Sequence, residues 1–167
     1  MNMRIPLIAA FALVACSKSA PAPAHDSWST APIGSVYETR TVTRMEKPFA
    51  HETETLTRQT LVARTNTEAS IKLEMSEGST MTAQVVTVPL KKSDAMPAHD
   101  GTITTKASDT CTVGAGTFPC TRATTEVHQG DATRSNVTWT AARFPVPIKS
   151  VVTNENMTIT SELVSVR

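Results

Sequence analysis

In the stretch EASIKLEMSE (68–77), apolar and polar residues alternate strictly from Glu68 to Ser76. Ala69, Ile71, Leu73 and Met75 fall on one side of an extended chain, and polar or charged residues fall on the other. This period of two is typical of a β-strand with one buried face and one solvated face, as in antiparallel sheets. The pattern therefore favours a sheet over a helix here.

Similar patterns recur along the rest of the chain. Threonine, which is β-branched and favours strands, supplies 28 of the 167 residues. Segment 51–64 is ambiguous, because Leu56, Thr60 and Ala63 would also align on a helix, but its many threonines favour a strand. We predict an all-β fold, a curved antiparallel up-and-down sheet or half-open barrel of about eight to ten strands that pair mostly with sequence neighbours. The other expected strands are 36–45, 81–89, 102–108, 122–128, 135–141 and 156–166.

The first sixteen residues, MNMRIPLIAAFALVAC, form a second distinctive pattern. Arg4 precedes an apolar run from Ile5 to Val14, which has the length of a signal-peptide core and is too short to span a bilayer. The stretch resembles a bacterial lipoprotein signal, in which the last four residues, here Leu13 to Cys16, form a lipobox. The resemblance implies cleavage before Cys16 and a diacylglyceryl group on its sulfur. The alternative is an ordinary secretory signal with a chance cysteine.

A lipidated Cys16 would determine where the protein resides. Two or three acyl chains anchor a protein stably to a membrane. Ser17, rather than aspartate, follows the cysteine, so the resemblance favours the outer membrane, with the protein facing the periplasm. The Ala/Pro/Ser-rich stretch that follows lacks the apolar content of a core and is expected to be a semi-extended tether. We therefore divide the chain into a signal peptide (1–15), a lipidated tether (16–33) and a β domain (34–167).

The other two cysteines, Cys111 and Cys120, flank a candidate hairpin in CTVGAGTFPC. A two-residue turn at 115–116 would place them directly opposite each other. A four-residue turn over 114–117 also pairs them, and it moves Pro119 away from a ladder position that needs an N–H group. Because an exported protein meets an oxidising compartment, we expect a disulfide. Metal or thiol chemistry is the alternative, but the spacing is not C-x-x-C.

The C-terminal third combines four features: VGAGTFPCTR (113–122), NVTWTA (136–141), PVPIKSVV (145–152) and SELVSV (161–166). In this combination the chain resembles a group of strand-rich bacterial envelope proteins, in which a Gly-x-Phe-x-Cys-x-Arg hairpin precedes a Trp-bearing strand, a Pro-rich crossover and a last strand. Their layout is similar to curved, half-open β-barrels such as the periplasmic lipoprotein carriers. Cys111 departs from the pattern of this group, in which an aliphatic residue is more usual at that position. The group has no established activity, so the resemblance implies a fold and not a function.

The residues capable of chemistry form no recognisable catalytic or metal-binding motif. There is no H-E-x-x-H and no G-x-S-x-G elbow in the sequence. Asp94, Asp100 and Asp109 can in principle converge on Ca²⁺, but their spacing matches no known loop. We therefore expect a non-enzymatic protein with no catalytic residues, no metal site and no cofactor. The four histidines are expected to be solvent-exposed: His25, His51, His99 and His128.

Charge and sheet curvature limit the possible partners. The balanced net charge of +1 gives no indication of a nucleic-acid partner. A curved sheet with an apolar face offers a concave surface to a lipid tail or another hydrophobic ligand. The alternative is a structural or interaction lipoprotein that binds another envelope protein, and an enzyme is the least favoured class. We expect a monomer held at the membrane by Cys16. Five side chains can line a ligand cavity or simply fill a core: Met75, Met81, Met157, Phe118 and Trp139.

Overall fold

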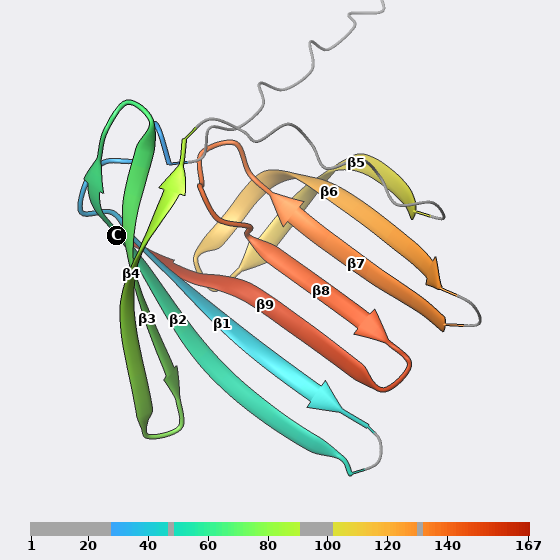
Figure 1. The fold of residues 1–167 in the computed structure, drawn as a ribbon. Coiled ribbons are helices and arrows are strands. Elements are labelled where there is room, and N and C mark those ends of the chain that lie inside the picture. Colours follow the sequence, from blue (N-terminus) through green and yellow to red (C-terminus); the bar gives the residue numbers. More distant parts are fainter. Residues whose placement is uncertain (1–27, 47–48, 91–101, 130–131) are drawn as a thin grey trace, which may run out of the picture.

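The computed structural model describes residues 28–46, 49–90, 102–129 and 132–167. Within these residues the chain forms nine strands and no helix, in one curved sheet that does not close (Figure 1). The predicted all-β fold is confirmed. No helix long and apolar enough to cross a membrane occurs in this part of the chain. The strands are β1 (Val36–Met45), β2 (His51–Arg64), β3 (Glu68–Glu77), β4 (Thr80–Pro89), β5 (Thr102–Val113), β6 (Gly116–Gln129), β7 (Ala132–Thr140), β8 (Lys149–Asn154) and β9 (Met157–Val166).

The sheet consists of two meanders joined through the first and last strands. Its strand order is β4-β3-β2-β1-β9-β8-β7-β6-β5, and every pair is antiparallel. Sequence neighbours pair within β1–β4 and within β5–β9, as predicted, and β1 pairs with β9 to connect the two halves. The strands β4 and β5, although consecutive in sequence, therefore form the two opposite edges of the sheet (Figure 1).

The predicted strands agree with the structure in most places. The alternating segment is β3, with Ala69 and Ile71 buried, and the ambiguous segment 51–64 is the strand β2. The sequence does not predict β8, because Pro145 and Pro147 mark a crossover and the strand begins only two residues after the second proline.

The core lies at one end of the sheet, where three segments pack near β1, β2 and β9. These segments are 28–32, the crossover 141–148 and the tip of the β5–β6 hairpin. Four aromatic rings connect them by edge-to-face contacts: the ring centroids lie 5.5 Å apart for Trp28–Tyr37, 6.4 Å for Tyr37–Phe144 and 5.0 Å for Phe144–Phe118. Since Trp28 is buried, the packed part of the chain begins before the domain boundary expected at Gly34.

The tip of the β5–β6 hairpin is fixed on a bulge in β9. The β1–β9 register shifts so that Val164 has no partner in β1. Beside this bulge, the backbone N–H of Ala115 donates to the Leu163 carbonyl at 3.1 Å. A Cβ atom on Gly114 would lie only 3.2 Å from the Val164 Cα atom. The close approach of the two backbones therefore favours glycine at position 114, because a larger residue would push against the β9 backbone.

Glu38 is a buried acidic residue, 7% exposed, that joins several elements. Its carboxylate accepts a hydrogen bond from the Ser165 hydroxyl at 2.6 Å, pairs with Arg58 at 2.7 Å and contacts Arg167 at 3.3 Å. The Ser165 hydrogen bond, followed by the Arg58 hydrogen bond, holds the pKa of the Glu38 carboxyl below its ordinary value. This network ties β1, β2, β9 and the C-terminal residue together.

Leu61 and Leu56 of β2 offer a matched test of where the core lies. Leu61 is fully buried, whereas Leu56 is 38% exposed. We predict that Leu61→Ala lowers the free energy of unfolding by about 2–5 kcal/mol, because a cavity is left behind. Leu56→Ala should cost less than about 1 kcal/mol. Urea denaturation checks both values, and equal losses would contradict the observed burial.

The Glu38 network predicts a pH dependence of stability. Because the pKa of Glu38 is lower in the folded chain, its contribution is complete above the ordinary glutamate pKa of about 4.3 and is lost as the pH falls through the folded value. Glu38→Gln should therefore be less stable than the unmodified protein at neutral pH, with a difference that shrinks in acid. Denaturation series at several pH values measure this, with Glu46→Gln, an exposed position, as the control. A difference that stays constant with pH would contradict the assignment.

Candidate functional site

The two faces of the sheet differ in charge. All six ion pairs between described residues lie on one face, which we call the ionic face. Examples are Arg40 with Glu54 and Lys149 with Glu162, each at 2.6 Å. Cross-strand partners share a face of an antiparallel sheet, so the strand register places these residues together.

Across the middle of the opposite face, five adjacent strands each place one hydroxyl in a single row. Thr41 of β1 lies opposite Thr55 of β2 on one side and Ser161 of β9 on the other. Ser161 lies opposite Ser150 of β8, which lies opposite Thr138 of β7. Neighbouring strands are about 4.8 Å apart, so the five hydroxyls follow one another at that spacing. We call this set the hydroxyl row, and the side of the sheet that carries it the hydroxyl face.

A cavity of about 270 Å³, the hydroxyl pocket, lies over part of this row. Its floor consists of half-buried hydroxyl and amide side chains, and Val146 and Pro147 of the crossover line its other side. The aromatic contacts of Phe144 hold the crossover in this position. The lining residues are Thr39, Thr41, Thr57, Gln59, Val146, Pro147, Ser150 and Ser161.

Most polar groups of the hydroxyl pocket are available to a ligand. Thr41 and Ser161 share a hydrogen bond of 2.9 Å between their hydroxyl oxygens. The side chains of four other lining residues form no hydrogen bond within the described part of the chain: Thr39, Thr57, Gln59 and Ser150. Each hydroxyl can donate and accept, and the amide offers both kinds of group.

A second and larger cavity lies on the same face, toward β6, β7 and the β8–β9 turn. We call it the amide pocket; its volume is about 520 Å³, within the range of about 300–1,000 Å³ typical of ligand sites. Thr138 of the hydroxyl row donates a hydrogen bond of 3.2 Å to the Asn136 side chain, which connects the row to this pocket. The lining residues are Thr125, Val127, Thr133, Arg134, Asn136, Asn154, Glu155 and Asn156.

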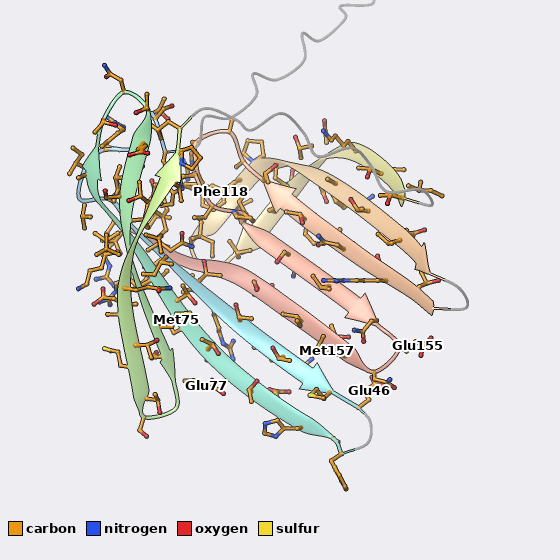
Figure 2. The ribbon with its side chains drawn as sticks, in the orientation of Figure 1. Glu46, Met75, Glu77, Phe118, Glu155 and Met157 are labelled. Atoms are coloured by element: carbon orange, nitrogen blue, oxygen red, sulfur yellow. A yellow bond between two sulfur atoms is a disulfide. The ribbon has the colours of Figure 1, made fainter. Side chains whose placement is uncertain are left out.

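The five side chains that the sequence suggests for an apolar cavity do not come together. Phe118 is buried in the core, whereas Met75 and Met157 lie at separate places on the sheet (Figure 2). Met81 and Trp139 lie on the ionic face. Among the residues that the structure describes, most of those that line the cavities of the hydroxyl face are instead threonine, serine, asparagine or glutamine, which no pattern in the sequence marks as a site.

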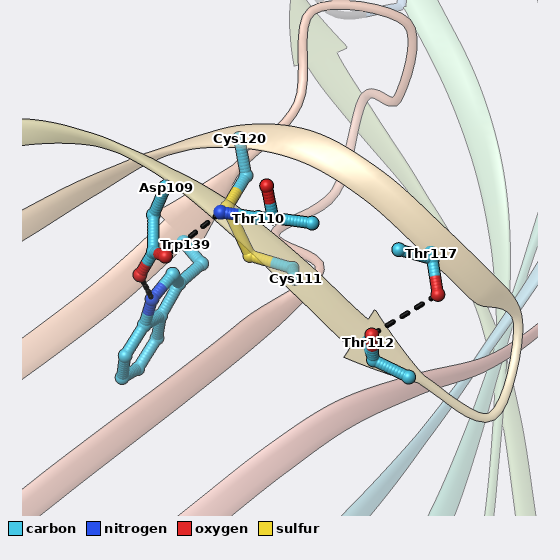
Figure 3. Close-up of a disulfide and its surroundings, with 7 residues drawn as sticks. All are labelled: Asp109, Thr110, Cys111, Thr112, Thr117, Cys120 and Trp139. Carbon is cyan, nitrogen blue, oxygen red and sulfur yellow. Dashed lines mark hydrogen bonds between the residues drawn. A yellow bond between two sulfur atoms is a disulfide. The ribbon is translucent and has the colours of Figure 1, made fainter.

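The predicted disulfide between Cys111 and Cys120 is confirmed, with a Cα–Cα distance of 6.1 Å (Figure 3). Both predicted hairpin registers are wrong, because the turn is formed by residues 114–115. Cys111 therefore lies opposite Phe118 and Cys120 lies opposite Asp109, so the bridge crosses the hairpin diagonally. In this register Phe118 reaches the ring of Phe144 in the core. Packing of the hairpin tip thus decides a register that the turn sequence leaves open.

Beside the disulfide, Trp139 is held by Asp109 (Figure 3). The indole Nε1 donates to one carboxylate oxygen of Asp109 at 3.0 Å, and the backbone N–H of Thr110 donates to the other at 2.7 Å. The Trp139 hydrogen bond, with help from Thr110, lowers the pKa of the Asp109 carboxyl. Lys149 Nζ lies 5.9 Å from the indole ring centroid. The contacts of Asp109 are therefore those of a side chain that positions a tryptophan.

The remaining predicted residues are only partly covered by the structure. Among the described residues, no group of three or more acidic, histidine or cysteine side chains could hold a metal ion. His51 lies at the start of β2 and is exposed. The other predicted positions, including the cysteine expected to carry lipid, lie outside the described residues or the described side chains: Cys16, His25, Asp94, His99, Asp100 and His128.

No protein family and no curated protein matches this chain in sequence. The fold, however, is similar to the crystal structure of a predicted exported protein with a YmcC-like fold from Bacteroides fragilis. The similarity has a TM-score of 0.51 at 10% sequence identity, and it covers 81% of this chain and 96% of that protein. At so low an identity the similarity shows a shared fold: a curved, open sheet of antiparallel strands.

Proposed function

We propose that this chain is a lipid-anchored, non-enzymatic protein of the bacterial cell envelope whose hydroxyl face binds an uncharged, hydroxyl-rich ligand of the carbohydrate class. The observation that carries the proposal is the hydroxyl row, which passes by the hydroxyl pocket and continues through Asn136 into the amide pocket. The row contains no charged side chain, and several polar groups next to it have no partner within the described residues.

The chemistry of the pocket favours a sugar over an acyl chain. A hydrocarbon chain would displace water from Thr39, Thr57, Gln59 and Ser150 without replacing its hydrogen bonds, at a cost of about 1–3 kcal/mol for each group left unsatisfied. A sugar hydroxyl replaces those bonds, and the apolar side chains of the crossover can contact the C–H groups of a sugar ring. The lipid or hydrophobic ligand expected from the sequence therefore fits this face less well.

The spacing of the row also suggests how a ligand would lie. Adjacent strands are about 4.8 Å apart, which is close to the advance of consecutive units in an extended glycan. A glycan lying across the strands would present one sugar unit to each strand, from Thr55 through Ser150 to Thr138. The amide pocket, with Arg134 and Glu155 at its wall, would then receive one end of the ligand.

Three observations support a location in the envelope. The N-terminal sequence resembles a lipoprotein signal ending in Cys16. The disulfide between Cys111 and Cys120 suits an oxidising compartment. The fold is similar to that of a protein predicted to be exported. The sequence also suggests a lipoprotein that binds another envelope protein. The cavities of the hydroxyl face do not favour that proposal in the way that they favour a sugar ligand.

Removal of one hydroxyl tests the ligand proposal. Calorimetry of the full chain, in a detergent without a sugar head group, should detect binding of soluble oligosaccharides prepared from bacterial envelope glycans. Thr57→Val keeps the shape of the side chain but loses one hydrogen bond, so affinity should fall about 3- to 10-fold. Thr160→Val, on the ionic face, should leave affinity unchanged. Binding of palmitate but of no oligosaccharide would contradict the proposal.

Fractionation of cells tests the anchor separately. The unmodified protein should be found in the membrane fraction, because a lipidated cysteine holds it there. Cys16→Ala should release it to the soluble periplasmic fraction, whereas Ser17→Ala should not. A Cys16→Ala variant that stays with the membrane would disprove the lipid anchor without affecting the ligand proposal.

A further inference from the structure

We propose that the edge strand β4 pairs antiparallel with β4 of a second copy of this chain, about a two-fold axis at Ala83. Among the described residues β4 pairs only with β3, so the backbone N–H and C=O groups on its other side have no strand partner. Such an edge is a template for the addition of a strand. The inference does not depend on the proposed ligand or on the lipid anchor.

The composition of β4 sets it apart from most natural edge strands. Its sequence, TMTAQVVTVP, contains no charged residue. Met81 is 72% exposed and Val85 is 63% exposed. Natural sheets usually prevent edge pairing with charged side chains, especially lysine. The other edge of this sheet has that protection, since β5 carries the exposed Lys106 and Asp109.

Opposite residues 81–85 of β4, the neighbouring strand β3 adds no unpaired charge. Met81, Ala83 and Val85 lie on the ionic face, opposite Ser76, Glu74 and Lys72 of β3. Lys72 and Glu74 form an ion pair of 2.8 Å with each other. A second copy approaching β4 would therefore meet neutral side chains and a charge pair that is already compensated. Two copies can meet here without like-charge repulsion.

The sequence of β4 is complementary to itself in an antiparallel pairing. With Ala83 opposite Ala83 of the second copy, Met81 lies opposite Val85, and the polar Thr82 lies opposite Gln84. The apolar Met81–Val85 and Ala83–Ala83 pairs thus share one face, and the other face carries the polar Thr82–Gln84 pairs, with Thr80 opposite Val86 at each end. The ladder would span residues 80–86 and end before Pro89, which has no N–H to donate. A two-fold axis with the same segment on both sides is the commonest symmetry of homodimers.

A cysteine at the proposed axis provides a covalent trap. Opposed Cα atoms of an antiparallel pair are about 4.5–5.5 Å apart, within the range of about 4.4–6.8 Å that a disulfide spans. The full chain carrying Ala83→Cys, exported to the bacterial periplasm, should run as a dimer on a non-reducing gel and as a monomer after reduction. Thr105→Cys, in the β5 edge, should remain monomeric. Thermal melting verifies that each variant is folded.

Further variants test the register and the identity of the partner. Val85→Cys alone should give no dimer, because Met81 of the second copy faces it. Val85→Lys added to Ala83→Cys should abolish the dimer band. A folded Ala83→Cys variant that stays monomeric would overturn the proposal. A cross-link from Ala83→Cys to a different protein would also overturn it, because the partner strand would then be foreign. Dimers formed by Val85→Cys alone would overturn it as well, because they would exclude the register with Ala83 on the axis.

Discussion

Edge-to-face contacts among four aromatic rings connect parts of the chain that are far apart in sequence. Trp28, Tyr37, Phe144 and Phe118 come from the N-terminal segment, β1, the crossover and β6, respectively. A sheet this poor in large apolar residues cannot bury one whole face, so its core is concentrated at one end. The crossover is held there by these rings, and without it the hydroxyl pocket would lose its apolar side. The pocket therefore depends on contacts made by residues that do not line it.

The division of chemistry between the two faces follows from the register. Paired residues share a face, so the ion pairs of β1 with β2 and of β8 with β9 lie on the same side. The charged residues alternate along β1 with Thr39, Thr41 and Thr43, which consequently lie on the other side. The hydroxyl row is thus the counterpart of the cross-strand ion pairs on the ionic face.

Local patterns in the sequence predict the strands but not the site. The period of two in β3 and the threonine run of β2 indicate strands directly, and the cysteine pair predicts its bridge. The hairpin register could not be predicted, since it depends on where Phe118 packs. The hydroxyl row could not be predicted either, because Thr41 and Ser161 are 120 residues apart and meet only through the β1–β9 pairing. Alternating threonines alone indicate a solvated strand face and give no sign that it forms a pocket.

The β1–β9 pairing also bears on how the protein is synthesised. Val36 and Arg167 exchange backbone hydrogen bonds of 2.8 and 3.0 Å, so the two ends of the sheet domain lie side by side. Of the nine strands in the described residues, β1 leaves the ribosome first and its second partner, β9, leaves last. Until β9 is available, one side of β1 has no partner, and its backbone groups can pair with a wrong strand. A circular permutant opened between β4 and β5 would convert the fold into a plain meander, in which each strand meets its partner in the order of synthesis.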